Sequence, residues 1–212
     1  MVDFMKGVDR MIEWNYNLIP AMSCIEVCDI RAYRGTPGPT YDQVLMEAWL
    51  NVVHGVKGIC WFHYFEYNTI QYQAMADFCD QITRLAKIVL GPDPGREVTD
   101  NANEPGRRVD LMVRETDSLI YVFAVRLTEV DEVDSPAVEV TFKVAGITNE
   151  QVEVFDEQRT LVVNNGEFKD SFAPNDVHIY LITKTTAELK PPLIQRYTKP
   201  EIDIYPNPIK IK

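Results

Sequence analysis

The chain has 212 residues, of which 46% are hydrophobic and 25% charged, so it can form one large or two small domains around an ordinary globular core. The net charge of −11 and the lack of a Lys/Arg run argue against binding of nucleic-acid phosphates. No apolar stretch reaches the roughly 18 residues that cross a membrane, and the N-terminus lacks the pattern of a signal peptide. We therefore expect neither a nucleic acid nor a membrane as partner.

Five segments of the first 90 residues alternate between helical spacing and short apolar runs: 2–16 (helix), 19–28 (strand), 40–55 (helix), 55–65 (strand) and 70–89 (helix). Thr40 and Gln43 have the spacing of a capping box at the start of the second helix, and Gly55 is suited to its C-terminal end. This order is typical of the βαβ units of a parallel sheet.

The four cysteines all lie in this first part, within apolar segments: Cys24, Cys28, Cys60 and Cys79. Such surroundings favour buried free thiols over disulfides. Their spacing is not that of a paired-cysteine zinc site, so the sequence predicts no metal and no cofactor.

The most informative segment is Gly55–Glu66, whose apolar run Ile59–Phe62 predicts a strand buried on both faces of a parallel sheet. Trp61, His63 and Glu66 gather toward its C-terminal end, where parallel α/β folds carry their chemistry. An aromatic ring stacks on the C–H face of a sugar while a carboxylate binds its hydroxyls. The alternative is a well-packed core strand whose polar end begins a loop.

Beyond Gly91–Gly95 the hydrophobic period changes from helical to two. Six segments have the pattern of strands: Arg107–Glu115, Ser118–Leu127, Ala137–Val144, Gln151–Phe155, Thr160–Val163 and Val177–Ile182. Short strands at this spacing favour an antiparallel β-sandwich. The sequence thus predicts an α/β segment over 1–92, a β-sandwich over 96–185 and a Pro-rich tail over 186–212.

A parallel sheet of only two strands cannot bury both of its faces, and bare sheet edges recruit other strands. Either the chain completes its sheet as a homo-oligomer, or it is the C-terminal part of a longer protein that supplies the missing strands. We expect a partner chain to cover these edges in any stable form.

The segment from Glu47 to Tyr64 joins an Ala-containing helix, a Gly-Val-Lys-Gly turn and an aromatic strand, and Leu119–Val125 and Phe168–Tyr180 have the pattern of sandwich strands. Over roughly residues 1–185 this layout resembles the end of a (β/α)8-barrel glycoside hydrolase with its C-terminal β-sandwich. The resemblance implies an α/β plus all-β fold, in which the last two strands and helices of a partial barrel are followed by an antiparallel β-sandwich.

The resemblance also implies a site. In a large group of retaining enzymes of this fold the nucleophile is a Glu at the end of the seventh strand, which makes Glu26 the candidate catalytic residue. Five residues are candidates for binding the carbohydrate substrate: Asp29, Arg34, Trp61, His63 and Glu66. The chemistry needs a second carboxyl group, about 5–5.5 Å away for retention. Its usual strand is absent here, so we expect a fragment that is inactive alone.

Each of these residues has a structural alternative. Glu26 shares a strand face with Cys24 and could pair with Arg31 or Arg34, and Asp29 could cap a turn. The alternative function is a non-catalytic module, in which the sandwich binds a glycan or packs structurally and the βα segment serves as its docking platform.

The tail contains Tyr-Pro-Asn-Pro within Ile202–Lys212, followed by alternating apolar residues. This pattern resembles the opening of the C-terminal sorting domain on cargo of the Bacteroidetes type IX secretion route. It implies an extracellular or periplasmic location for the parent protein; the alternative is an ordinary Pro-rich tail.

Overall fold

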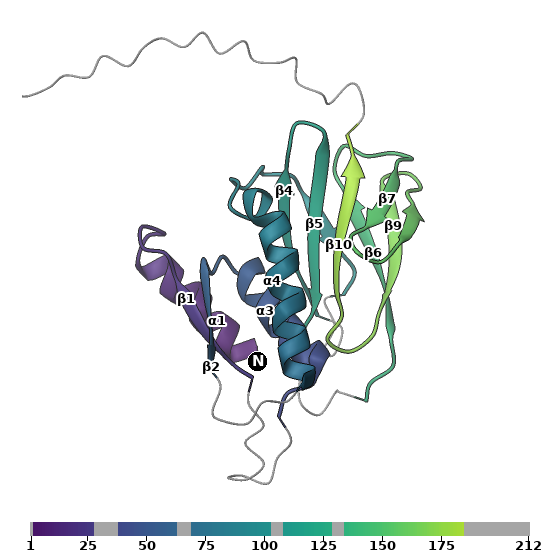
Figure 1. Cartoon of the computed structure of the whole chain (residues 1–212). Helices are drawn as coiled ribbons and strands as arrows, with labels where there is room; N and C mark the ends of the chain where they lie inside the picture. The colour runs from purple at the N-terminus through teal and green to yellow at the C-terminus, as the bar shows by residue number, and fades with distance from the viewer. Residues whose placement is uncertain (1, 28–37, 63–68, 103–107, 129–133, 185–212) are drawn as a thin grey trace, which may run out of the picture.

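The computed structural model describes residues 2–27, 38–62, 69–102, 108–128 and 134–184. Figure 1 shows a small parallel sheet beside helix α1, a middle layer of two helices, and two antiparallel sheets beyond them. The helices are α1 (Val2–Trp14), α3 (Tyr41–Val53) and α4 (Thr69–Val89). The strands are β1 (Met22–Glu26), β2 (Gly58–Phe62), β3 (Val98–Asp100), β4 (Val109–Glu115), β5 (Leu119–Arg126), β6 (Val138–Val144), β7 (Gln151–Val154), β8 (Arg159–Val162), β9 (Glu167–Phe172) and β10 (Val177–Thr183).

The N-terminal half contains the predicted βαβ unit. Strands β1 and β2 pair in parallel, and α3 connects them. The predicted capping box is confirmed: the Thr40 side chain accepts from the Gln43 backbone N–H at 3.2 Å, and the Gln43 side chain accepts from the Thr40 N–H at 2.9 Å. Among the described residues this sheet has two strands, so the outer edges of β1 and β2 have no strand neighbour there.

The C-terminal half is the predicted antiparallel β-sandwich. A five-stranded sheet in the order β4-β5-β10-β7-β8 faces a three-stranded sheet in the order β3-β6-β9. In β9 every second side chain is buried, as expected for a strand with one face in a core. Phe142 lies at the centre of this core, with its ring stacked 5.0 Å from Phe168 and tilted 5.3 Å from Tyr180.

Helix α3 packs against the outer face of the five-stranded sheet and joins the two halves. On β5, Ile120 and Val122 point into the sandwich, while Tyr121 and Phe123 belong to the core beneath the helices. The indole of Trp49 in α3 lies 5.6 Å from the Phe123 ring. Because β5 is covered on both faces, it is buried along nearly its whole length. Strand β5 therefore contributes side chains to two hydrophobic cores, one inside the sandwich and one beneath the helices.

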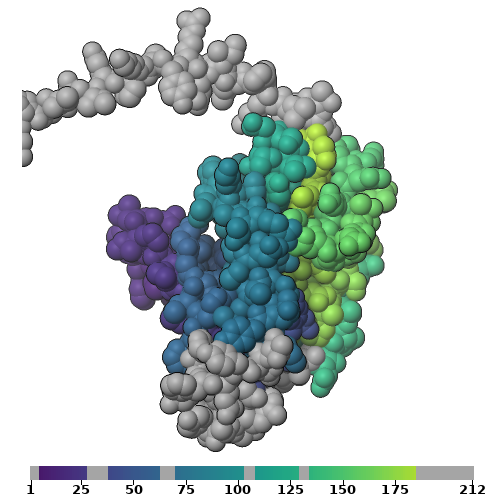
Figure 2. Space-filling view, in the orientation of Figure 1, coloured from purple at the N-terminus to yellow at the C-terminus, as the bar shows by residue number. Residues whose placement is uncertain are grey.

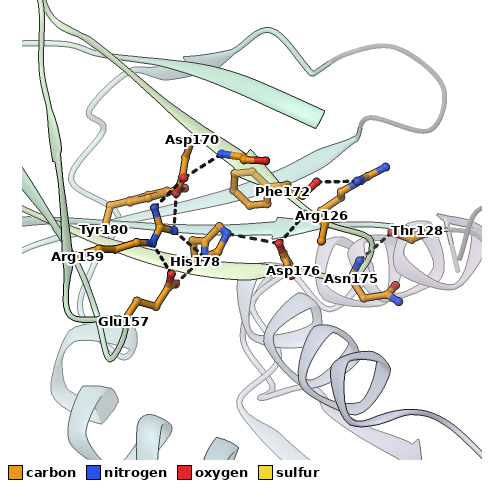
Figure 3. A network of polar contacts seen from close by, with 12 residues as sticks. Arg126, Thr128, Glu157, Arg159, Asp170, Phe172, Asn175, Asp176, His178 and Tyr180 are labelled. Atoms are coloured by element: carbon orange, nitrogen blue, oxygen red, sulfur yellow. Dashed lines mark hydrogen bonds and ion pairs between the residues drawn. The ribbon is translucent and has the colours of Figure 1, made fainter. Parts of the chain in front are cut away.

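A buried polar network holds one part of the sandwich (Figure 3). The Arg159 guanidinium donates to both oxygens of Asp170 at 2.7 Å, and the Tyr180 hydroxyl donates to Asp170 at 2.9 Å. His178 contacts Glu157 through Nδ1 at 2.6 Å. Burial opposes protonation of His178, but the hydrogen bonds to Asp176 and Glu157 dominate and raise its pKa to about 9. His178 therefore has a structural role within the sandwich.

Arg126 occupies a second buried position in the same region. Its side chain is fully buried and donates to the backbone carbonyls of Phe172 at 2.7 Å and Pro136 at 3.2 Å. It also donates to the Ser135 hydroxyl at 3.0 Å. The arginine thus satisfies carbonyl groups where strands end, which is a structural use of a buried charge.

Candidate functional site

Glu26 is the last residue of β1, at the carboxyl end of the parallel pair, and its side chain is exposed. It is paired in register with Phe62 at the end of β2. We call this side of the sheet the open face; it carries the exposed residues Met22, Cys24, Glu26, Cys60 and Phe62. The predicted sharing of a face by Glu26 and Cys24 is therefore present in the structure.

The cysteines differ from expectation. Cys24, Cys60 and Cys79 are free, as predicted, but all three are exposed, so the prediction of buried thiols was wrong for them. Cys24 and Cys60 are exposed because no element among the described residues covers the open face, whereas Cys79 lies on the exposed side of α4. Cys28 lies outside the described residues.

A second carboxyl group lies near Glu26. Glu47 in α3 is half-buried, and burial followed by the negative charge of Glu26 raises its pKa to about 7. Such a group is present in both protonation states at neutral pH, which is the property that proton transfer needs. Glu47 is not among the candidates that the sequence pattern indicated. The available signal was a single acid inside the otherwise apolar stretch of α3, where burial raises its pKa.

Trp61 lies on the opposite face of the sheet from Glu26. It is paired in register with the buried Ile25, and its ring packs edge-on against Phe78 of α4, with centroids 5.7 Å apart. Alternate residues of a strand point to opposite faces, so the helix side receives Trp61 while the open face receives Glu26. The structure does not bring these two candidates together.

Trp61 lines an apolar groove between β2 and α4, with a volume of about 370 Å³. Its walls include Ile59 from the strand and Phe78, Ile82 and Val89 from the helix. The other four candidates for substrate binding, Asp29, Arg34, His63 and Glu66, lie outside the described residues. The same holds for Arg31, the alternative ion-pair partner of Glu26.

A polar hollow of about 330 Å³ lies between α4 and the sandwich. Within it Tyr41 donates to Asp77 at 2.8 Å, and Arg84 contacts Asp80 at 2.9 Å and also pairs with Asp156. The Arg84 guanidinium lies 4.5 Å from the ring centroid of Phe155. These groups satisfy one another and tie α4 to the sandwich. In the described ranges, no three His, Cys, Asp or Glu side chains are placed to hold a metal ion.

His54 ends α3 and links three elements. Its Nδ1 lies 2.6 Å from Asp9 of α1, and its Nε2 lies 2.9 Å from Asp110 of β4. Burial lowers the pKa of His54, but the hydrogen bonds to Asp110 and Asp9 outweigh it, and the net shift is upward. His54 therefore bridges two carboxylates that belong to α1 and β4.

Comparison with known proteins gives a likeness in fold. No family model matches this chain, and no curated protein is similar to it in sequence. An α-amylase from Anoxybacillus superposes with a TM-score of 0.52 at 12% identity, covering 87% of this chain and 46% of the amylase. The α-amylase of Geobacillus thermoleovorans, solved with acarbose, gives a TM-score of 0.53 at 12% identity, over 82% of this chain and 42% of that one.

A third structure, AmyP in complex with maltose, has a TM-score of 0.51 at 12% identity, over 76% of this chain and 40% of AmyP. The chain thus spans less than half the length of these enzymes. At such identity the likeness shows a glycoside hydrolase-like fold and leaves substrate and chemistry open. Among the described residues, no helix is both long and apolar enough to cross a membrane.

Proposed function

We propose that this chain is the C-terminal part of a carbohydrate-active hydrolase, in which β1 and β2 are the last two strands of a (β/α)8 barrel. The observation that carries this proposal is the extent of the likeness to the Anoxybacillus amylase. A superposition over 87% of the chain has to include large parts of both the βαβ half and the sandwich. The packing of α3 on the sandwich, through Trp49 and Phe123, supports the view that both halves form one unit.

Within this proposal Glu26 is the nucleophilic carboxylate. It ends β1 at the carboxyl edge of the parallel sheet, where barrels carry their catalytic groups, and its side chain lies on the open face. The ionised carboxylate attacks the anomeric carbon and forms a glycosyl ester, while an acid elsewhere protonates the leaving oxygen. That acid belongs to strands that the described residues do not contain, so the chain alone is expected to be inactive.

The protonation state of Glu47 determines how much negative charge lies near Glu26. Two nearby carboxyl groups do not ionise independently, and the more buried one is the harder to ionise. Because the pKa of Glu47 is raised to about 7, its neutral form is populated near neutral pH. A neutral Glu47 removes a negative charge from the surroundings of Glu26.

The test begins with the length of the natural polypeptide. We expect the reading frame that encodes this chain to continue upstream through further βα units, and the full polypeptide to hydrolyse an α- or β-linked glycan. In that protein Glu26→Gln should lower kcat at least about a thousandfold, which corresponds to an increase of about 4 kcal/mol in the activation free energy. Glu139→Gln, an exposed carboxylate paired with Lys169 in the sandwich, is the matched control and should leave kcat unchanged. Full activity of Glu26→Gln would refute its role.

One observation favours the second candidate function, a non-catalytic module. Trp61 packs against Phe78 on the helix side, so it is not available as a stacking platform beside Glu26. A module of this kind would bind a glycan without cleaving it. Titration calorimetry of the chain with soluble oligosaccharides, followed by chromatography of the sugars, distinguishes the two: binding with intact sugar supports the module, and cleavage by the chain alone contradicts both accounts.

A further inference from the structure

Two cysteine side chains meet at the centre of the open face. Cys24 lies in the middle of β1 and Cys60 in the middle of β2, and the parallel register pairs them directly. Both are exposed free thiols, and Cys60 lies close enough to raise the pKa of Cys24. Since paired residues of adjacent strands point to the same face, the two sulfur atoms are neighbours above the sheet. The third described cysteine, Cys79, belongs to α4 and is apart from this pair.

The spacing of the strands suits a covalent bond between them. Adjacent strands lie about 4.7–4.9 Å apart, and a disulfide requires Cα atoms about 4.4–6.8 Å apart. A bond between Cys24 and Cys60 therefore requires rotation of the two side chains and no separation of the strands. Their exposure also admits a small oxidant to either sulfur atom.

We propose that Cys24 and Cys60 form a reversible disulfide by exchange with a low-molecular-weight disulfide, which makes the centre of the open face a redox site. This inference concerns this chain by itself, in which the open face is exposed; it does not extend to a longer protein whose further strands enclose that face. In the first step a thiolate of the pair attacks one sulfur of the small disulfide and releases one small thiol. In the second step the other cysteine loses its proton and attacks the mixed disulfide, which forms the protein S–S bond and releases the second small thiol.

Protons and electrons balance in this exchange. The protein loses two protons and two electrons, and the small disulfide gains both to become two thiols. The hydrogen bond with Cys60, followed by its negative charge, raises the pKa of Cys24. Exchange starts from a thiolate beside a thiol, because the neighbouring thiol can then resolve the mixed disulfide.

The bond would also change the stability of this half of the protein. It would close a loop that contains α3 and join two strands that are held together by one ladder. Cross-linking a loop reduces the entropy of the unfolded chain, so the oxidised protein should unfold at a higher urea concentration than the reduced protein.

The experiment uses the full chain carrying Cys28→Ser and Cys79→Ser, so that only the proposed pair remains. The protein is equilibrated with oxidised and reduced glutathione, quenched with acid, alkylated and digested with trypsin. The bond links the peptides Met11–Arg31 and Gly58–Arg84, which each contain one remaining cysteine. The measured quantity is the ratio of the concentration of oxidised glutathione to the square of the concentration of reduced glutathione at which half of the protein is oxidised. This ratio should be at least about tenfold lower for the native chain than for the same chain in guanidinium, which corresponds to a difference of about 30 mV in reduction potential.

Two further variants make the result specific. Cys24→Ser and Cys60→Ser, each in the same background, should lose the linked peptide and carry glutathione on the remaining cysteine instead. The wild-type chain, with all four cysteines, should give the same linked peptides, which guards against a folding defect in the variants. Equal ratios in native buffer and in guanidinium, glutathione on both cysteines without a link, or a link between two molecules on a non-reducing gel would each overturn the proposal.

Discussion

Replacement of Trp49 tests whether the helices and the sandwich share one core. The indole is fully buried, with its ring 5.4 Å from Phe78 of α4 and 5.6 Å from Phe123 of β5. Its Nε1 donates to the Gln81 side chain at 2.9 Å. An indole of roughly 200 Å², at about 25 cal/mol per Å², gains about 5 kcal/mol on burial. Since alanine retains part of this, Trp49→Ala should reduce the free energy of unfolding by about 3–5 kcal/mol.

The assay is urea unfolding followed by far-UV circular dichroism, which reports helices and strands together and does not depend on the removed tryptophan. We expect one transition that moves to lower urea, because the same side chain holds both halves. Trp14→Ala is the matched control: that side chain is 75% exposed, and its loss should change stability by less than about 0.5 kcal/mol. A loss below about 1 kcal/mol for Trp49→Ala, or a helical transition that separates from the strand transition, would refute the shared core.

Three further predictions concern charge and association. Because the pKa of His178 is raised to about 9 in the folded chain, its contribution to stability is fully present below about pH 6.5 and lost as the pH rises to 9; urea midpoints across this range should fall for the wild type and stay level for His178→Gln. Arg126→Met should cost about 2–4 kcal/mol in the same unfolding assay, because it leaves the Phe172 and Pro136 carbonyls unpaired; a neutral effect would show that water replaces the guanidinium. Light scattering of the chain alone should report a dimer or larger, since β1 and β2 have unpaired edges in the described structure; a stable monomer would argue against a sheet completed by association.

Local signals in the sequence were sufficient where neighbouring residues decide the outcome. The Thr40–Gln43 capping box placed the start of α3, because its hydrogen bonds lie within one turn. The alternation of segments such as Ala137–Val144, which is β6 in the structure, predicted a sandwich, since a strand with one buried face needs a period of two. The same alternation correctly assigned Glu26 and Cys24 to one face of β1.

The tertiary structure decided which of the two faces of a strand is covered. From the sequence, Trp61 belonged either to an open binding site at the end of the strand or to a hydrophobic core. Only the position of α4 shows that it packs against Phe78. The cysteines were expected to be buried because their neighbours are apolar, yet the covering elements lie on the other side of β1 and β2. Figure 2 shows the N-terminal segment projecting on the side away from the sandwich.

The charges depended on contacts between distant segments. Glu47 has a pKa of about 7 because folding buries it beside Glu26, a residue 21 positions earlier in the sequence. His54 bridges Asp9 and Asp110, which belong to α1 and β4. Periodicity and capping rules describe interactions within a few residues, so the sequence by itself determined the elements and their faces. The protonation of Glu47 and the meeting of Cys24 with Cys60 required the packing that brings separate elements together, because burial and Coulomb interactions act through space.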